Sequence, residues 1–196
     1  MTRQAIEPTA RERLLASANQ LFYAEGVHTV GIDRIIEHAG VAKGSLYNIF
    51  GSKERLVGAY LAARHDGTTE RLMAAVERHR NPRKRLLAVF EAQGEIVAQP
   101  GFRGCAFVAA TAEGAHGGVI GQAAKNYRAW IRGLFTDLAE QAGATNPGEL
   151  ARQLQIIYDG AGLAAGMDHD PSIAKSARAA AEALLDAAMT LVPRQT

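Results

Sequence analysis

The chain has 196 residues, of which 47% are hydrophobic and 21% are charged, and its formal net charge at pH 7 is +2. This composition is typical of a folded globular protein, and the length suits one sizeable domain or a small domain joined to a larger one. The single cysteine excludes an internal disulfide framework and a cysteine-rich zinc site. Neither a signal peptide nor an apolar run of the ~20 residues that span a membrane is present, so we expect a cytoplasmic protein.

The predicted elements are all helices, about nine of them, because no stretch alternates in the way that a strand does. Thr9 and Glu12 form a capping box at the start of the first helix, and Gly26 follows its end. A long helix is predicted from Ser52 to about His79. Three later helix starts are marked by Asn or Asp before Pro, at 81–82, 146–147 and 170–171.

Residues 32–53 carry the pattern of a helix-turn-helix. Two short amphipathic segments flank a turn at Gly40 and Val41. The inward residues of the first segment are Ile32, Ile35, Ile36 and Ala39, and those of the second are Leu46 and Phe50. In a helix-turn-helix the first turns of the second helix enter the major groove of DNA. The pattern therefore predicts a DNA-binding protein.

Two segments resemble the tetracycline-repressor (TetR) family of bacterial regulators. Residues 39–47 read A-G-V-A-K-G-S-L-Y and residues 50–56 read F-G-S-K-E-R-L. They are similar to the family patterns A-G-V-S-K-G-T-L-Y and F-x-S-K-E-x-L. The chain departs from the family at Ala42, at Asn48 with Ile49, and at Gly31. The remaining 140 or so residues resemble the family only in being helical.

The resemblance implies an all-α fold in two parts. We expect a three-helix DNA-binding domain at residues 1–51 and a larger helical domain for ligand binding and dimerisation at residues 52–196. The first 65 residues carry eight Lys or Arg against six Asp or Glu, whereas the rest carries fourteen of each kind. The small positive excess thus falls in the part that would contact phosphate.

The candidate DNA contacts lie on and around the second helix of the motif. Lys43 is the strongest candidate for a base or phosphate contact, and Gly44 would let the backbone approach DNA closely. Arg34 could contact the DNA backbone or form a salt bridge with Glu37 or His38. The full predicted set is Arg34, Ala42, Lys43, Gly44, Ser45, Tyr47, Asn48 and Lys53.

The larger half lacks a catalytic signature, but its aromatic residues fall on several different helices. Helical bundles that enclose a ligand line the space with such side chains, although plain core packing is the alternative for each of them. Cys105 lies near a helix start, where it could be a redox sensor or an inert core residue. The predicted ligand-binding residues are Phe90, Phe102, Cys105, Phe107, Tyr127, Trp130 and Tyr158. No metal or other cofactor is expected.

The last two helices are rich in small residues, which allow helices to approach closely. Such a face could pack within the chain, or meet its own copy in a symmetric dimer with a four-helix interface. The predicted interface consists of Gly160, Gly162, Leu163, Gly166, Ala177, Ala181, Leu184 and Ala188.

We interpret the sequence as that of a homodimeric regulator that binds an operator in double-stranded DNA, and not as an enzyme. The preferred hypothesis is a repressor that a small lipophilic molecule releases from DNA. One alternative is a helical binding protein or enzyme with a vestigial helix-turn-helix. Another is an architectural DNA-binding protein that has no effector.

Overall fold

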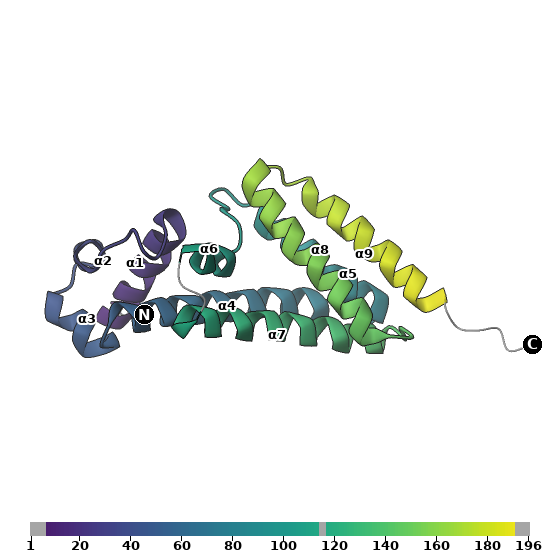
Figure 1. Ribbon diagram of the computed structural model, residues 1–196, viewed down its shortest axis with the longest axis horizontal. Helices are drawn as coiled ribbons and strands as arrows, with labels where there is room; N and C mark the ends of the chain where they lie inside the picture. The colour runs from purple at the N-terminus through teal and green to yellow at the C-terminus, as the bar shows by residue number, and fades with distance from the viewer. Residues whose placement is uncertain (1–6, 114–116, 191–196) are drawn as a thin grey trace, which may run out of the picture. The chain divides into compact units, whose positions relative to one another are not determined.

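The computed structural model describes residues 7–113 and 117–190 of the chain. In this part the chain forms nine α-helices and no strand, as expected for an all-α protein. The helices, drawn in chain order in Figure 1, are α1 (Ala10–Glu25), α2 (Ile32–Ala39), α3 (Lys43–Phe50), α4 (Lys53–Glu77), α5 (Pro82–Val97), α6 (Ala106–Glu113), α7 (Gly118–Gln141), α8 (Pro147–Asp168) and α9 (Ile173–Thr190). None of these helices is long and apolar enough to cross a membrane.

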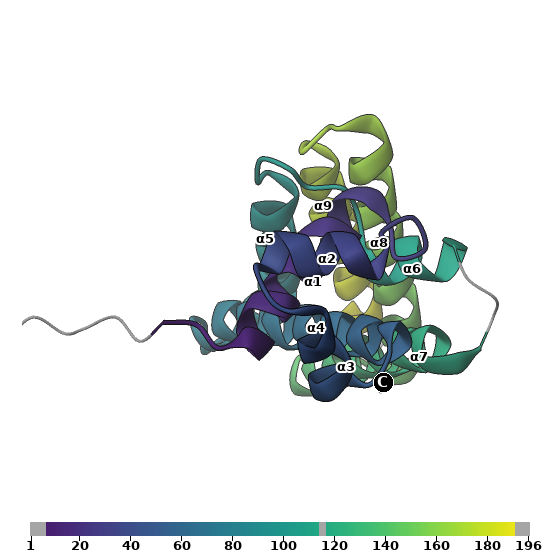
Figure 2. The same cartoon turned by 90° about the vertical axis from the view of Figure 1, so that its left-hand side faces the viewer.

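The first of two compact units comprises residues 1–64 and 106–124. Figures 1 and 2 show α1, α2 and α3 grouped at the first turns of α4. Their apolar faces meet in a core in which Phe22 and Tyr60 contact edge to face, with ring centroids 5.5 Å apart. The fully buried residues of this core include Leu14, Ile35, Leu46, Leu56 and Leu61.

The helix starts predicted at Thr9, Asn81 and Asn146 are confirmed by their backbone contacts, whereas α9 begins at Ile173, two residues after the predicted Pro171, because Asp170 accepts from the Ser172 amide in a turn before the helix. The Glu12 amide donates to Thr9 Oγ1 over 3.2 Å, and the Thr9 amide donates to Glu12 Oε2 over 2.7 Å, which completes the capping box. Asn81 and Asn146 cap α5 and α8, because their side chains accept from the amides of residues 84 and 149. These caps satisfy amides that have no partner inside their own helix.

The second unit comprises residues 65–105 and 125–196. In Figures 1 and 2 α8 and α9 lie side by side, and α5 packs against both of them. The rings of Phe90, Phe135 and Tyr158 contact one another in the core, with centroids 5.5–6.2 Å apart. Aliphatic residues that are fully buried here include Leu72, Leu86, Ile131, Leu138 and Leu185.

The division of the chain into residues 1–51 and 52–196 stays a prediction. The proposed boundary falls just before α4, which begins at Lys53. However, α4 and α7 each contribute residues to both compact units. A boundary at residue 51 therefore lies between α3 and α4 in the sequence, but it does not coincide with the boundary between the two compact units, which falls within α4 and within α7.

Candidate nucleic-acid interface

The helix-turn-helix is formed by α2, a tight turn and α3. Gly40 ends α2 with φ 61° and ψ 44°, a left-handed conformation that residues with a Cβ rarely adopt. Ile35 and Ile36 are buried on α2, and Leu46 and Phe50 are buried on α3, as the sequence pattern predicts. The apolar side chains therefore fix α3 on the rest of the unit and leave its opposite face open.

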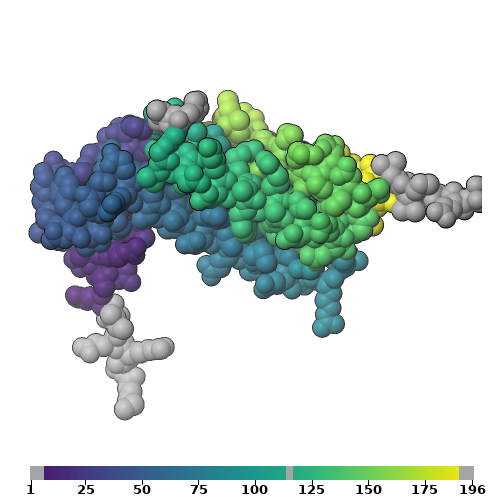
Figure 3. Space-filling view, turned by 60° about the horizontal axis from the view of Figure 1, so that its bottom comes forward, coloured from purple at the N-terminus to yellow at the C-terminus, as the bar shows by residue number. Residues whose placement is uncertain are grey.

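That opposite face carries most of the predicted DNA contacts. Ala42, Lys43, Gly44, Tyr47 and Asn48 are exposed, and Ser45 is half-buried. In Figure 3 the atoms of this region, coloured blue, lie at the surface. Beyond the adjoining backbone of α3, a Cβ added at Gly44 would meet no heavy atom of the described residues within 4 Å. No other element in the described part of the chain packs against Gly44, and a partner could approach the backbone there.

The start of α3 lacks a capping side chain. Ala42 is the residue before the helix, and within the described chain no side chain caps the first turn of α3. The amides at a helix start have no partner inside the helix, and the helix dipole favours negative charge at that end. The exposed start of α3 is therefore suited to a phosphate oxygen.

Lys43 is paired with a residue that the sequence analysis did not single out. Its Nζ lies 2.7 Å from Asp33 Oδ1, at the start of α2. The hydrogen bond with Asp33 raises the pKa of Lys43 above its ordinary value. Both side chains are mostly exposed, at 65% and 82%, and exposed ion pairs are weak and screened by salt. A phosphate group could therefore take the place of the carboxylate.

Arg34 pairs with Glu25, the last residue of α1, and forms two hydrogen bonds with its carboxylate. This partner differs from Glu37 and His38, the two residues considered for a salt bridge from the sequence. The reason is tertiary, because the fold brings the end of α1 to the outer side of α2. His38 contacts Ser17 of α1 instead, with 3.0 Å between Nδ1 and Oγ.

Lys53 begins α4 and is half-buried. Its Nζ donates to the backbone oxygen of His28 over 3.3 Å, which ties the start of α4 to the connection between α1 and α2. A residue of α6 also binds this connection: the His28 amide donates to Oε2 of Glu113, the last residue of α6, over 2.8 Å. No local pattern predicts this contact, since His28 and Glu113 are 85 positions apart in the chain.

The residues predicted to bind a ligand are divided between the two units. Phe107 is buried in the first unit, whereas Phe90, Tyr127 and Tyr158 are buried in the second. Phe102, Cys105 and Trp130 belong to the second unit and are half-buried. The Phe90 and Tyr158 rings contact each other and Phe135, and His65 lies edge-on to both Tyr127 and Trp130.

Polar groups are buried beside these rings in the second unit. Burial raises the pKa of Tyr158 to about 12 and also raises that of Tyr127, and the two phenols share a hydrogen bond. Gln93 donates from Nε2 to the backbone oxygen of Tyr158 over 2.7 Å. Its Oε1 is buried, and no group in the described part of the chain donates to it. A buried acceptor without a donor is costly, so this site favours a partner that carries an N–H or O–H group.

The predicted dimer residues fall on different sides of α8 and α9. Gly162, Ala177 and Ala181 are buried within the chain, and a Cβ at Gly166 would lie 3.0 Å from the Cα of Gly104. These small residues therefore pack against other parts of the same chain, and their place in a dimer interface stays a prediction. Leu184 and Ala188 are half-buried, whereas Gly160 and Leu163 are exposed.

Comparison with known proteins links the helix-turn-helix and the whole fold to one group. A family model described as "Bacterial regulatory proteins, tetR family" matches residues 14–60. The crystal structure of a TetR-family transcriptional regulator from Streptomyces coelicolor is 34% identical to this chain. That alignment covers 92% of this chain and 96% of the other, with a TM-score of 0.87.

Two curated relatives share shorter stretches. The transcriptional activator FasR of Mycolicibacterium smegmatis is 37% identical over 82 residues, which are 42% of this chain and 37% of FasR. The transcriptional repressor NemR of Escherichia coli is 36% identical over 112 residues, which are 55% of each chain. The matched parts thus span only 37% and 55% of the length of these relatives.

Proposed function

Because the chain belongs to the TetR family of bacterial transcriptional regulators, we propose that it represses transcription from an operator and leaves that operator when a small lipophilic molecule binds. The observation that carries the proposal is the open outer face of α3. It joins an uncapped helix start at Ala42 to the exposed side chains of Lys43, Tyr47 and Asn48. This combination provides phosphate contacts for position and polar groups for base edges.

Sequence-specific binding would use two copies of α3, one from each subunit of a homodimer. The exposed apolar residues of α8 support such a dimer. Ile156, Gly160, Leu163 and Met167 follow one another at a spacing of four, three and four residues, so they share one face of the helix. Ile156 and Met167 are 69% and 72% exposed in the single chain. A symmetric dimer would bury this face and set two recognition helices about 34 Å apart.

The effector would bind among the aromatic residues of the second unit. Tyr127, Trp130 and Tyr158 supply apolar surface, and the Oε1 of Gln93 supplies an acceptor that needs a donor. A mainly apolar molecule with one hydrogen-bond donor fits this combination. To act as an inducer, it must bind the state that releases DNA more tightly than the state that holds it.

The first experiment determines whether the chain reads DNA sequence. Selection from a random duplex library would yield the operator, and fluorescence anisotropy would measure the affinity for it. We expect a near-palindromic site and much weaker binding to scrambled DNA. Binding with no preference for sequence would instead support the architectural alternative, and an absence of binding would support a vestigial motif.

The second experiment gives the direction of regulation. A reporter gene placed downstream of the selected operator should be expressed less when the wild-type chain is present. Increased expression would identify the chain as an activator, which is the role of FasR. Trp130 is the single tryptophan, so effectors that restore the reporter should also change its fluorescence.

A further inference from the structure

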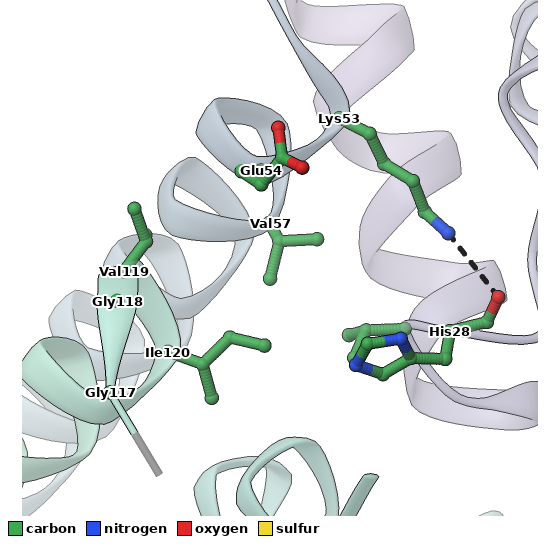
Figure 4. Close-up of a pocket in the computed structure, with 9 residues that line it drawn as sticks. His28, Lys53, Glu54, Val57, Gly117, Gly118, Val119 and Ile120 are labelled. Atoms are coloured by element: carbon green, nitrogen blue, oxygen red, sulfur yellow. Dashed lines mark hydrogen bonds between the residues drawn. The ribbon is translucent and has the colours of Figure 1, made fainter. Parts of the chain in front are cut away.

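A pocket of about 420 Å³ lies within the first unit, apart from the aromatic cluster of the second. Three segments enclose it. The connection between α1 and α2 contributes Val27 and His28, the first turns of α4 contribute Lys53, Glu54 and Val57, and residues 117–120 come from the start of α7. Figure 4 shows these side chains around a common space. The volume is in the range of pockets that hold small ligands.

The walls of this pocket are mainly aliphatic. Val27, Val57, Val119 and Ile120 line it, and the first two are buried. In Figure 4 the side chains of Val57 and Ile120 extend into the space from α4 and α7. A ligand would therefore place a hydrocarbon body between these two helices, where it gains free energy by leaving water.

The polar groups at the pocket favour an anion over a cation. Among the residues that the structure describes, the Lys53 ammonium donates to a neutral acceptor, the backbone oxygen of His28 at 3.3 Å. Glu54 also lines the pocket and stays negatively charged, since hydrogen bonds from Ser52 and from its own backbone amide lower its pKa, but those hydrogen bonds already engage its carboxylate. At the start of α7, the amides of residues 118–120 are the first of their helix, an end at which negative charge is stabilised.

We propose that this pocket is a second ligand site, for a small carboxylate with an aliphatic or aromatic body. The hydrocarbon part would lie against Val57 and Ile120. The carboxylate would pair with Lys53, since an ammonium–carboxylate hydrogen bond is stronger than one to a neutral oxygen. The site is distinct from the aromatic cluster of the second unit, and a ligand could occupy it independently.

Such a ligand would compete directly with DNA. Lys53 is one of the predicted phosphate contacts, and it cannot serve a phosphate and a bound carboxylate equally well. Occupancy of the pocket should therefore weaken operator binding through the DNA-binding unit itself. This effect on DNA rests on the proposed function, whereas ligand binding to the pocket does not.

The test uses 3-phenylpropionate and its uncharged amide as probes, with the full-length protein labelled with ¹⁵N. We expect 3-phenylpropionate to bind in the millimolar range and to shift the amide signals of residues 27–28, 53–57 and 118–120. The uncharged probe, 3-phenylpropionamide, should bind about tenfold more weakly, because it cannot form the charged pair with Lys53. Ile120→Trp should fill the space and remove the shifts.

Two further variants make the result decisive. Val119→Trp also fills the pocket. Val119 is 44% exposed, so this variant should fold, and it replaces Ile120→Trp if that variant does not. Val108→Trp is the matched control, because Val108 is 45% exposed on α6 and does not line the pocket. Wild type and Val108→Trp should lose operator affinity as 3-phenylpropionate is added, whereas the filled variants should not.

The proposal is overturned if 3-phenylpropionate does not bind, or if Ile120→Trp and Val119→Trp bind it as wild type does. It is also overturned if 3-phenylpropionamide binds as tightly as 3-phenylpropionate. A loss of operator binding in the absence of any probe would count against the proposed function instead, and the NMR titration would still decide whether the pocket binds a carboxylate.

Discussion

Asp33 and Lys43 connect the two helices of the helix-turn-helix through a hydrogen bond of 2.7 Å between Oδ1 and Nζ. The turn at Gly40 lies between them in the chain. The ammonium group that is best placed to contact DNA is thus held by a carboxylate on the same surface. DNA must displace this carboxylate or accept it close to a phosphate, so Asp33 should oppose binding.

Asp33→Asn should therefore bind the operator more tightly than wild type does. The change frees Lys43 and removes a negative charge that would lie near phosphate. The gain should shrink as salt is added, since exposed charges are screened. Anisotropy titrations at several salt concentrations would measure it. Asp137→Asn, an exposed change of the same charge on α7, serves as the control, and equal affinities for the two variants would contradict the expectation.

Lys43→Gln should weaken binding while the fold remains intact. If Lys43 contacts a phosphate, the slope of log affinity against log salt should decrease in magnitude by about 0.9, as one counterion fewer is released. If it reads a guanine, discrimination at one base pair should decrease by about 1–3 kcal/mol. Lys175→Gln, an exposed change on α9, should alter neither quantity. An affinity in Lys43→Gln that equals wild type would remove Lys43 from the interface.

Leu163→Glu should dissociate the proposed dimer, because it places a charge on the exposed apolar face of α8. Ala181→Glu should act differently, since Ala181 has no exposed surface within the single chain and a buried unpaired charge destabilises the fold. Sedimentation velocity and thermal unfolding would separate the two effects. A wild-type chain that stays monomeric at micromolar concentration would refute the dimer.

Gly26→Ala should lower the free energy of unfolding by about 1–2 kcal/mol. Gly26 has φ 95°, and an added Cβ would lie 2.6 Å from Glu113 Oε1. Gly133→Ala is the contrasting change, because Gly133 is inside α7 and, beyond the adjoining backbone of that helix, no described atom lies within 4 Å of its Cβ position. It should raise stability by roughly 0.5–1 kcal/mol. Urea unfolding of both variants would show whether the signs are opposite.

The buried phenol of Tyr158 should make the protein sensitive to alkali. Its pKa in the folded state is about 12, above the ordinary value of 10.0. The folded state thus holds this proton more tightly, and the associated stability is complete below pH 10 and is lost as the pH rises to 12. The contribution of Tyr158 should be on the order of 2 kcal/mol, and Tyr158→Phe should lose less stability than wild type over this range, with Tyr127 still contributing because burial raises its pKa as well. Urea unfolding at neutral and alkaline pH would test this difference.

The sequence predicts those features that depend on neighbouring residues. The caps at Thr9, Asn81 and Asn146 were predictable because a short polar side chain reaches amides only three residues away. The turn at Gly40 was predictable because a glycine there separates two amphipathic segments. The inward positions of Leu46 and Phe50 follow from the period of the helix.

Contacts between distant elements were not predictable in this way. Nothing in the sequence relates Glu113 to His28, or Glu25 to Arg34, because such pairs form only once the helices have packed. The small residues of α8 and α9 illustrate the same limit. Helical periodicity places Gly162 and Ala181 on apolar faces of their helices. It does not show whether such a face packs against the same chain or against a second copy of the protein.

The bare start of α3 at Ala42 has a consequence for the dynamics of recognition. A helix that begins without a capping side chain is weaker at that end by about 1 kcal/mol. The amides of Lys43 and Gly44 should therefore exchange with solvent readily in the free protein. A phosphate that accepts from them would close the first turn, so that DNA itself would complete the helix that reads it. Part of the binding free energy would then be used to order this turn. Hydrogen exchange at the Lys43 and Gly44 amides should therefore slow when the operator is bound, and not when scrambled DNA is added.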